Sequence, residues 1–257
     1  MLLATTAPDA PAPPRSPSGS DVLGPARTPA PPPIVTEEVP VAGDKPVYAV
    51  RGSTTHARKG VFLAGKCAHP AAYLNTFPYA AAAYGDFVGV QGDTPCGGAM
   101  TWWSANPPAI VRRIEKAFDV AGVGELRDAT LVGYSQGAER AEWIAAYAPD
   151  RFTRFVLISS PISPSAAHLK GAHAVVLMAG AKESQGLMRD AVPKLRTAGI
   201  PAIFMELPGA RHGDMGPMAH DVMKSALDWL EENDAVTKST KSTALAVTPT
   251  PARAIGD

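Results

Sequence analysis

Short apolar runs alternate along this chain with longer segments whose apolar residues recur at the helical period. The runs are four or five residues long and predict buried strands at 61–64, 87–91, 129–132, 155–158, 174–178 and 202–206. Apolar residues spaced three and four apart predict helices at 110–120, 138–147, 186–198 and 217–230, and an alanine-rich stretch predicts one more that ends at Tyr84. This alternation indicates an α/β fold with a mostly parallel central sheet and helices on both faces.

A hairpin and two polar ends flank this pattern. Runs 34–41 and 45–50 surround Gly43-Asp44, a dipeptide typical of tight turns between antiparallel strands. Residues 1–33 are rich in Pro, Ala, Ser and Thr, and residues 234–257 carry Lys-Ser-Thr and Thr-Pro repeats. Such compositions predict a disordered tether and a disordered tail around one folded domain at 34–233. Met1–Ala4 is too short for a signal-peptide core, which leaves a start upstream of Met1 open.

Polar residues gather where the predicted strands end. The clusters occupy 66–69, 93–98, 159–160, 182–185 and 211–214, and Ser135 follows strand 129–132 in the same way. In open α/β sheets, ligands bind beyond the carboxyl ends of the strands. The sequence therefore predicts a single site that several strand-end loops build together.

The segment Gly133-Tyr134-Ser135-Gln136-Gly137 joins a predicted strand to a predicted helix. A strand that turns directly into a helix forces the central residue toward positive φ, and glycines two residues away prevent a collision. A serine in a glycine-rich turn is often only a turn residue. In this strand–turn–helix setting, however, the pattern predicts a nucleophile elbow with Ser135 as the nucleophile. The N–H of Gln136, at the start of the helix, would stabilise an oxyanion.

A serine nucleophile needs a base and an acid that orients the base. His212 is the candidate base, because it stands in a glycine-containing loop directly after the last strand. Glu183 is the candidate acid, because it follows strand 174–178, between the nucleophile and the base. A surface glutamate beside Lys182 is the alternative interpretation. The weaker carboxylate candidates are Asp214, Asp190 and Asp150, and the other five of the six histidines are His56, His69, His168, His173 and His220.

With the nucleophile, acid and histidine in this order, residues 45–233 resemble the α/β-hydrolase superfamily. The Gly-Tyr-Ser-Gln-Gly elbow is similar to those of cutinases and of small carboxylesterases and thioesterases. The resemblance implies the α/β-hydrolase fold and a serine hydrolase that cleaves carboxylic esters through an acyl-enzyme. Gly65-Lys66-Cys67 stands where many lipases and esterases have His-Gly, and the acid is Glu rather than the commoner Asp. We therefore expect the second oxyanion N–H from Lys66 or Cys67.

The connection between two of the predicted strands bears on the substrate pocket. Only 159–171 lies between the runs that begin at 155 and 174, so we expect no large lid and an open site. The candidate pocket residues are His69, Tyr134, Trp102 and Trp103, although both tryptophans would equally suit a helix start packed on the core. A peptidase or thioesterase with the same triad is the second interpretation. The third is an inactive α/β-hydrolase fold used for binding, against which the intact triad argues.

Charge and composition exclude several other function classes. Lysine plus arginine and aspartate plus glutamate number 24 each, so the formal net charge is zero and we expect no nucleic-acid partner. No apolar run reaches the roughly 18–20 residues of a membrane span. Neither a metal-ligand cluster nor a dinucleotide-binding glycine pattern occurs, so we expect no cofactor and no metal. The expected partner is a small-molecule ester, and the oligomeric state stays open.

Cys67 and Cys96 are the two cysteines of the chain. In the fold that the resemblance implies, strands 61–64 and 87–91 are sheet neighbours, and each cysteine follows one of them. We therefore predict a disulfide between Cys67 and Cys96 that fixes the oxyanion loop. A disulfide and a proline-rich tether together favour an exported protein, periplasmic, secreted or tethered. Two free thiols that pack as small core residues are the alternative.

Overall fold

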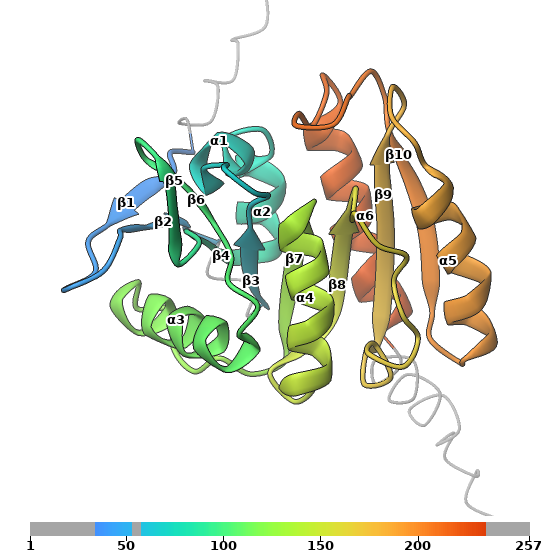
Figure 1. Ribbon diagram of the computed structural model, residues 1–257, viewed down its shortest axis with the longest axis horizontal. Coiled ribbons are helices and arrows are strands. Elements are labelled where there is room, and N and C mark those ends of the chain that lie inside the picture. Colours follow the sequence, from blue (N-terminus) through green and yellow to red (C-terminus); the bar gives the residue numbers. More distant parts are fainter. Residues whose placement is uncertain (1–33, 53–57, 235–257) are drawn as a thin grey trace, which may run out of the picture. The chain divides into compact units, whose positions relative to one another are not determined.

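The computed structural model describes residues 34–52 and 58–234, and one large sheet forms the centre of this part of the chain (Figure 1). Its strands are β1 (Glu37–Val39), β2 (Val47–Val50), β3 (Arg58–Leu63), β4 (Gly85–Val90), β7 (Ala129–Tyr134), β8 (Phe152–Ile158), β9 (Ala174–Gly180) and β10 (Ala202–Leu207). Their order in this eight-stranded sheet is β1-β2-β4-β3-β7-β8-β9-β10. β2 pairs antiparallel with β1 and with β4, and every other neighbouring pair is parallel. The predicted mostly parallel sheet and the N-terminal hairpin are thus confirmed.

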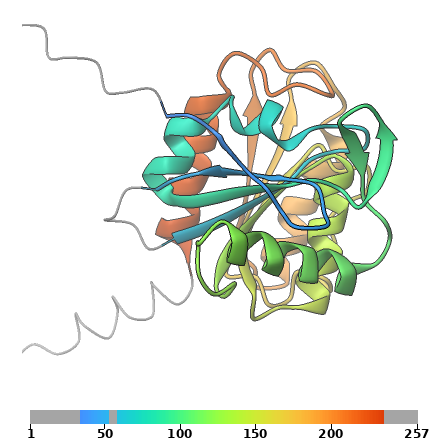
Figure 2. The same ribbon diagram turned by 90° about the vertical axis from the view of Figure 1, so that its left-hand side faces the viewer.

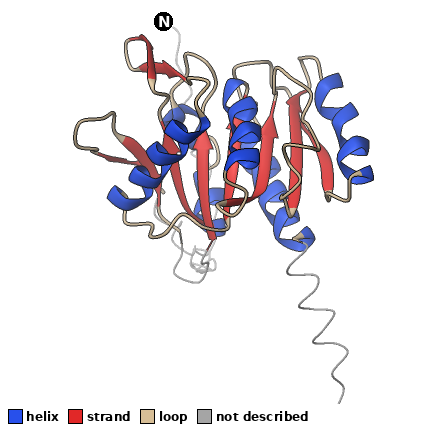
Figure 3. Ribbon diagram, turned by 60° about the horizontal axis from the view of Figure 1, so that its bottom comes forward, coloured by secondary structure: helices blue, strands red, loops and turns tan. Residues whose placement is uncertain are grey.

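Helices cover both faces of the sheet, as the alternation predicts. They are α1 (Pro70–Leu74), α2 (Pro78–Tyr84), α3 (Pro107–Val120), α4 (Gln136–Tyr147), α5 (Gly186–Thr197) and α6 (Ala219–Asn233). α3, α4 and α5 pack on one face, and α1, α2 and α6 pack on the other (Figures 2 and 3). Within β3, Val61 and Leu63 face the first group of helices while Phe62 faces the second, and all three are fully buried. Burial on both faces explains why the strands read as unbroken apolar runs.

The alanine-rich stretch forms two short helices instead of the single helix that its composition predicts. α1 ends at Leu74, and α2 begins at Pro78. Phe77, which precedes the proline, has φ −140° and ψ 40°, outside the helical region. Proline disfavours helical backbone in the residue before it and lacks an N–H of its own, so the helix stops and restarts there.

The polar cluster at 93–98, which no predicted strand covers, forms the first half of a small hairpin. β5 (Thr94–Gly97) pairs antiparallel with β6 (Met100–Trp102), outside the main sheet. The chain reverses at Gly97 and Gly98, which have φ of 107° and 56°. Strands of four and three residues lack the alternation that predicts a strand, so the sequence pattern missed them.

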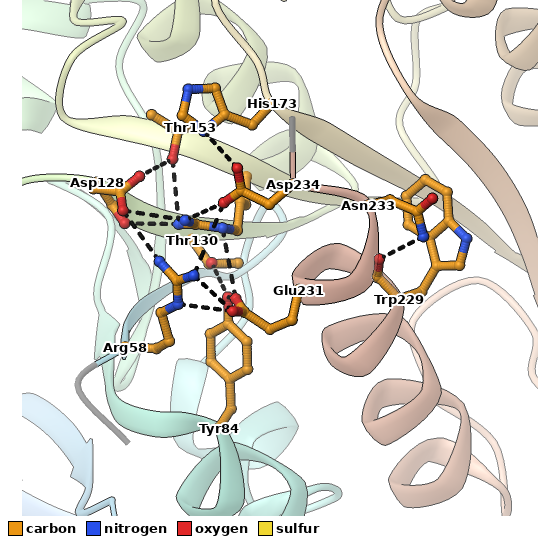
Figure 4. Close-up of polar contacts among 11 residues, drawn as sticks. Arg58, Tyr84, Asp128, Thr130, Thr153, His173, Trp229, Glu231, Asn233 and Asp234 are labelled. Carbon is orange, nitrogen blue, oxygen red and sulfur yellow. Dashed lines mark hydrogen bonds and ion pairs between the residues drawn. The ribbon is translucent and has the colours of Figure 1, made fainter. Parts of the chain in front are cut away.

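A polar network closes the amino end of the sheet, opposite the predicted site (Figure 4). The Arg154 guanidinium donates to the carboxylates of Asp234 and Asp128, and to the Asp128 carbonyl at 2.9 Å. Arg58 pairs with Asp128 and with Glu231, and Glu231 also accepts from the Tyr84 hydroxyl at 2.9 Å. Arg154 and Asp234 are each 1% exposed. The network therefore joins the end of α6 to the starts of β3, β7 and β8.

The two predicted disordered ends fall mainly outside the described residues. The tether at 1–33 and positions 235–257 of the tail lie outside the ranges given above, as does His56. Asp234, which the composition placed first in the tail, is buried in the network at the end of α6.

Candidate active site

Ser135 occupies the turn between β7 and α4. Its backbone has φ 52° and ψ −117°, and its N–H donates to the Ile158 carbonyl at 2.8 Å. Positive φ at a residue with a side chain costs on the order of 1–3 kcal/mol, and such strain clusters at functional sites. A Cβ on Gly133 would collide with the carbonyl oxygen of Gly137, and one on Gly137 would collide with that of Leu63. The two glycines therefore give this tight turn the room that it needs.

Two hydrogen bonds link Ser135, His212 and Glu183 in a chain. Ser135 Oγ and His212 Nε2 are 3.0 Å apart, and His212 Nδ1 is 2.8 Å from Glu183 Oε2. The loops after β7, β9 and β10 supply the three side chains, at the carboxyl ends of the parallel strands. The His212 side chain is 55% exposed, whereas that of Glu183 is 11% exposed. This geometry can pass the hydroxyl proton to the imidazole while the carboxylate holds the ring.

Ser159 orients Glu183, a role that the sequence did not indicate. Glu183 Oε1 accepts from the Ser159 hydroxyl at 2.6 Å and from the Gly180 N–H at 2.7 Å. Ser159 follows β8 and has φ 50°. With Oε1 held in this way, Oε2 faces His212. The polar pair at 159–160 was visible in the sequence, but its pairing with Glu183 depends on β8 and β9 being neighbours in the sheet.

Two tyrosines hold the loop that carries His212. Tyr134 Oη accepts from the Gly213 N–H at 2.7 Å, and the Tyr73 hydroxyl donates to the Gly213 carbonyl at 3.2 Å. The Tyr134 and His212 ring centroids are 5.7 Å apart. Tyr134 is 1% exposed, and burial raises its pKa to about 12. We predicted Tyr134 as a pocket residue, and the structure places it as a support of the histidine loop.

The loop after β3 passes beside the nucleophile. A Cβ on Gly65 would lie 3.2 Å from the Cβ of Ser135. Gly65 therefore lies against the nucleophile, and the peptide groups of Lys66 and Cys67 come directly after it in the chain. Lys66 is exposed, and its Nζ lies 5.3 Å from the ring centroid of Trp102, close enough for a cation–π contact.

The remaining predicted pocket residues differ in burial. Trp102 is half-buried beside Lys66, whereas Trp103 is 1% exposed and donates its indole N–H to the Ala64 carbonyl at 2.9 Å. His69 is half-buried, with its Nε2 3.1 Å from the Tyr48 hydroxyl, and burial lowers its pKa. Of these side chains, Trp102 fits a pocket wall best, and Trp103 packs in the core.

The predicted disulfide between Cys67 and Cys96 is present, and its Cα atoms are 5.3 Å apart. It ties the loop after β3 to the β5–β6 hairpin. The Ala68 N–H adds a hydrogen bond of 3.3 Å to the Thr101 carbonyl. The loop beside Ser135 is therefore fastened to the hairpin at two successive residues.

Replacing both cysteines with serine is expected to lower the free energy of unfolding by roughly 3–4 kcal/mol. The bridge spans 29 residues, and the chain-entropy model gives this value for a closed loop of about that length. Urea unfolding of the two proteins measures the difference. Alkylation of the unfolded, unreduced protein followed by intact mass checks that the disulfide is present. Two added alkyl groups would show two free thiols and contradict the prediction.

Cavity size alone does not locate the site. Clefts of about 520 and 540 Å³ run along α3 and the end of α4 and share Glu115 and Arg151, but no triad residue lines either of them. A smaller, mostly apolar cavity of about 140 Å³ adjoins the histidine loop, with Tyr73, Gly213 and Met215 in its wall. The hydrogen-bonded chain at Ser135 therefore defines the candidate site, and the small cavity adjoins it on the histidine side.

Two further features of residues 34–52 and 58–234 concern metal binding and membrane insertion. Within these ranges, no group of three or more His, Cys, Asp or Glu side chains is placed to hold a metal ion. None of the helices found there combines the length and the apolar character needed to cross a bilayer.

The sequence matches no family model and no curated protein, whereas many solved structures share its fold. A predicted CIB-like hydrolase from Thermoplasma acidophilum is 12% identical with a TM-score of 0.59, and the match covers 78% of this chain and 99% of that one. A fluorophosphonate-binding serine hydrolase F from Staphylococcus aureus is 13% identical with a TM-score of 0.56, over 72% and 91% of the two chains. A carboxylesterase from Mesorhizobium loti is 19% identical with a TM-score of 0.55, over 75% and 99%.

These matches define the class of the protein as an α/β protein with a mostly parallel sheet between two layers of helices. Its fold is the α/β-hydrolase fold. The connection from β8 to β9 contains neither a helix nor a strand, so no large lid is inserted there.

Proposed function

We propose that this protein is a serine hydrolase that cleaves carboxylic esters through an acyl-enzyme. The observation that carries the proposal is the hydrogen-bonded chain from Ser135 Oγ through His212 to Glu183 at the strained start of α4. Ser135 Oγ attacks the ester carbonyl carbon while His212 Nε2 takes its proton, and the alcohol leaves with that proton. Water, deprotonated by the same imidazole, then attacks the acyl-enzyme, which releases the acid and restores Ser135.

Two backbone N–H groups would stabilise the oxyanion that forms in each step. Gln136 is the first residue of α4, where helix N–H groups have no partner within the helix and carry partial positive charge. The second donor is the N–H of Lys66 or Cys67, in the loop that lies against Ser135. Donors held in place before the reaction stabilise the developing charge without reorganising.

The similar structures and the openness of the site support an ester as the substrate. A carboxylesterase and a fluorophosphonate-binding serine hydrolase share the fold. The 55% exposure of His212 and the 140 Å³ cavity beside it suit a short or accessible acyl group. A peptidase or thioesterase would use the same triad, and a binding protein would need none of it.

A fluorophosphonate probe and p-nitrophenyl esters of increasing acyl length test the proposal. We expect covalent labelling at Ser135, located by peptide mass, and turnover that is fastest for short acyl chains. Labelling without turnover of any ester would indicate a peptidase or thioesterase. A protein that is neither labelled nor active would indicate a binding function.

Replacing Glu183 with glutamine is expected to lower ester turnover on the order of 10⁴-fold, less than the loss of Ser135 or His212. Glutamine still accepts from Ser159 and Gly180 through Oε1, but it presents an NH₂ group to His212 Nδ1 and so favours the wrong ring tautomer. The rate of p-nitrophenyl ester hydrolysis measures the effect.

Glu206→Gln is the matched control, because Glu206 is an exposed carboxylate on β10 that pairs with Arg189 and Gln185. This control should keep the wild-type rate. A wild-type rate for Glu183→Gln would instead move the orienting role to another carboxylate, and Asp214 would be tested next.

An exported protein, working in an oxidising compartment, fits the disulfide between Cys67 and Cys96, because such bonds are rare where thiols are kept reduced. Cells quenched with iodoacetamide should yield protein in which neither cysteine is alkylated. Recovery with both thiols alkylated would argue against export.

A further inference from the structure

The chain that follows the β5–β6 hairpin crosses the first turns of α4. Gln136 Oε1 accepts from the Trp103 N–H at 3.0 Å, and Gln136 Nε2 donates to the Trp103 carbonyl at 3.4 Å. One turn further along α4, Arg140 Nε donates to the Ser104 carbonyl at 2.9 Å. Gln136 and Arg140 thus hold two successive residues of the crossing chain, from the same face of the helix.

Asp93 also holds Ser104 of this segment. Its carboxylate accepts from the Ser104 N–H at 2.7 Å and from the Ser104 hydroxyl. Arg140 is 7% exposed and stacks on the Trp143 ring, 4.1 Å from its centroid. The crossing segment is therefore fixed on α4 by partly buried contacts, which solvent weakens little.

Trp103 connects this crossing segment to the loop after β3, here called the oxyanion loop, which comprises residues 64–68 and carries the proposed second oxyanion donor. Its backbone is held by Gln136, while its buried indole donates to the carbonyl of Ala64, the residue before Gly65. The hairpin that precedes Trp103 is joined to the same loop by the Cys67–Cys96 disulfide and by the hydrogen bond between Ala68 and Thr101. One end of this loop is thus tied to Trp103, which Gln136 holds, and the other end is tied to the hairpin that directly precedes Trp103.

We propose that the Gln136 side chain is a positioning residue that couples the two halves of the oxyanion hole. Its own backbone N–H is one of the two donors of the proposed hydrolase, on which this inference rests. Its side chain fixes Trp103, and Trp103 fixes the loop that carries the other donor. The spacing between the two donors is therefore set through Gln136, Trp103 and Ala64. This spacing should affect kcat more than it affects substrate binding, because the oxyanion is absent from the bound substrate and forms only as the reaction proceeds.

Gln136→Met tests the coupling, because methionine has nearly the same length and makes neither hydrogen bond to Trp103. We expect the kcat for p-nitrophenyl esters to fall roughly 10- to 100-fold with KM nearly unchanged, the effect of a small misplacement of a reacting group. The affinity for an alkyl trifluoromethyl ketone, whose serine adduct carries an oxyanion, should fall by a similar factor.

Trp103→Phe is the second variant, and it carries the test if Gln136→Met does not fold. It removes the indole N–H that reaches Ala64 and should show the same fall in kcat with KM unchanged. Gln91→Met is the structural control, because Gln91 is buried and its side-chain amide donates to the Pro46 carbonyl at 3.0 Å rather than to Trp103. It should lower stability and leave kcat at the wild-type value.

A wild-type kcat and wild-type ketone affinity in both Gln136→Met and Trp103→Phe would overturn the coupling. A rise in KM with kcat unchanged would also overturn it, because this would assign Gln136 to substrate binding. Both results presuppose an active wild-type protein. Failure of the proposed function would instead appear as a wild-type protein that is neither labelled nor active.

Discussion

Replacing Ser135 with alanine is expected to reduce ester turnover by roughly 10⁶-fold, the usual effect of removing a triad nucleophile. The hydroxyl that lies 3.0 Å from His212 Nε2 would be gone, so no acyl-enzyme can form. The fold should not change, because alanine meets the same restriction as serine at φ 52°. Initial rates with p-nitrophenyl esters, together with circular dichroism, measure both effects.

Ser160→Ala is the matched control for this variant. Ser160 also stands at the carboxyl end of a central strand, but its buried hydroxyl accepts from the Ile162 N–H. Within the described residues, this hydroxyl makes no hydrogen bond to a histidine. The control should keep the wild-type rate and remain labelled by fluorophosphonate. If Ser135→Ala kept most of its activity, Ser135 would not be the nucleophile, and the proposed mechanism would be wrong.

The sheet and its helices were predictable because burial on both faces leaves a plain signal in the sequence. Apolar runs such as Phe155–Ile158 mark strands that are covered on two sides. In the helices between them, apolar residues recur every three to four positions. The sequence pattern did not predict two features of the fold. Pro78 divides an alanine-rich stretch, and the short strands β5 and β6 form beside the sheet, where alternation is weak.

The candidate site also has a part that the sequence predicts and a part that it does not. Ser135, Glu183 and His212 were predictable because each follows a strand and because their order along the chain is informative. The side chains that position them were not, since their partners lie far away in sequence. Ser159 meets Glu183 because β8 and β9 are neighbours, and Gln136 meets Trp103 because the chain that follows the β5–β6 hairpin crosses α4. Such pairings depend on three-dimensional packing, which a local pattern does not encode.

The network at the amino end of the sheet gives the second large expected effect, on stability. Arg154 is 1% exposed, and its guanidinium meets the carboxylate of Asp234, which is equally buried. Burial alone would lower the pKa of Arg154, but interactions with Tyr84, Asp128 and Asp234 outweigh burial and raise this pKa, so the charge of Arg154 persists in the folded protein. A buried ion pair gains little over apolar packing, but removing one partner leaves the other charged and unpaired.

Replacing Arg154 with methionine is therefore expected to lower the free energy of unfolding by about 3–5 kcal/mol. Methionine fills much of the same space, so the effect comes mainly from the lost charge. Urea unfolding followed by circular dichroism measures it. Arg189→Met is the matched control, because Arg189 and Glu206 form an exposed pair, 52% and 44% accessible, and such pairs contribute about 0–1 kcal/mol.

Acid should weaken the same network. Burial alone would raise the pKa of Asp128, but hydrogen bonds from Thr153 and Arg154, with the charges of Arg154 and Arg58, outweigh burial and hold it below its ordinary value. A carboxyl group with a lowered pKa stabilises the fold above its unfolded pKa of about 3.9 and loses this contribution as the pH falls. The stability difference between wild type and Arg154→Met should therefore shrink below about pH 4.

A double variant separates the lost charge pair from lost packing. If the cost of Arg154→Met comes from leaving the buried Asp234 carboxylate without the Arg154 guanidinium, then Arg154→Met with Asp234→Leu should be more stable than Arg154→Met alone. His173 Nδ1, 3.2 Å from Asp234 Oδ1, would lose its partner in the double variant, so full recovery is not expected. Additive losses from the two substitutions would show that the pair is not coupled. The network would then stabilise the end of α6 through packing alone.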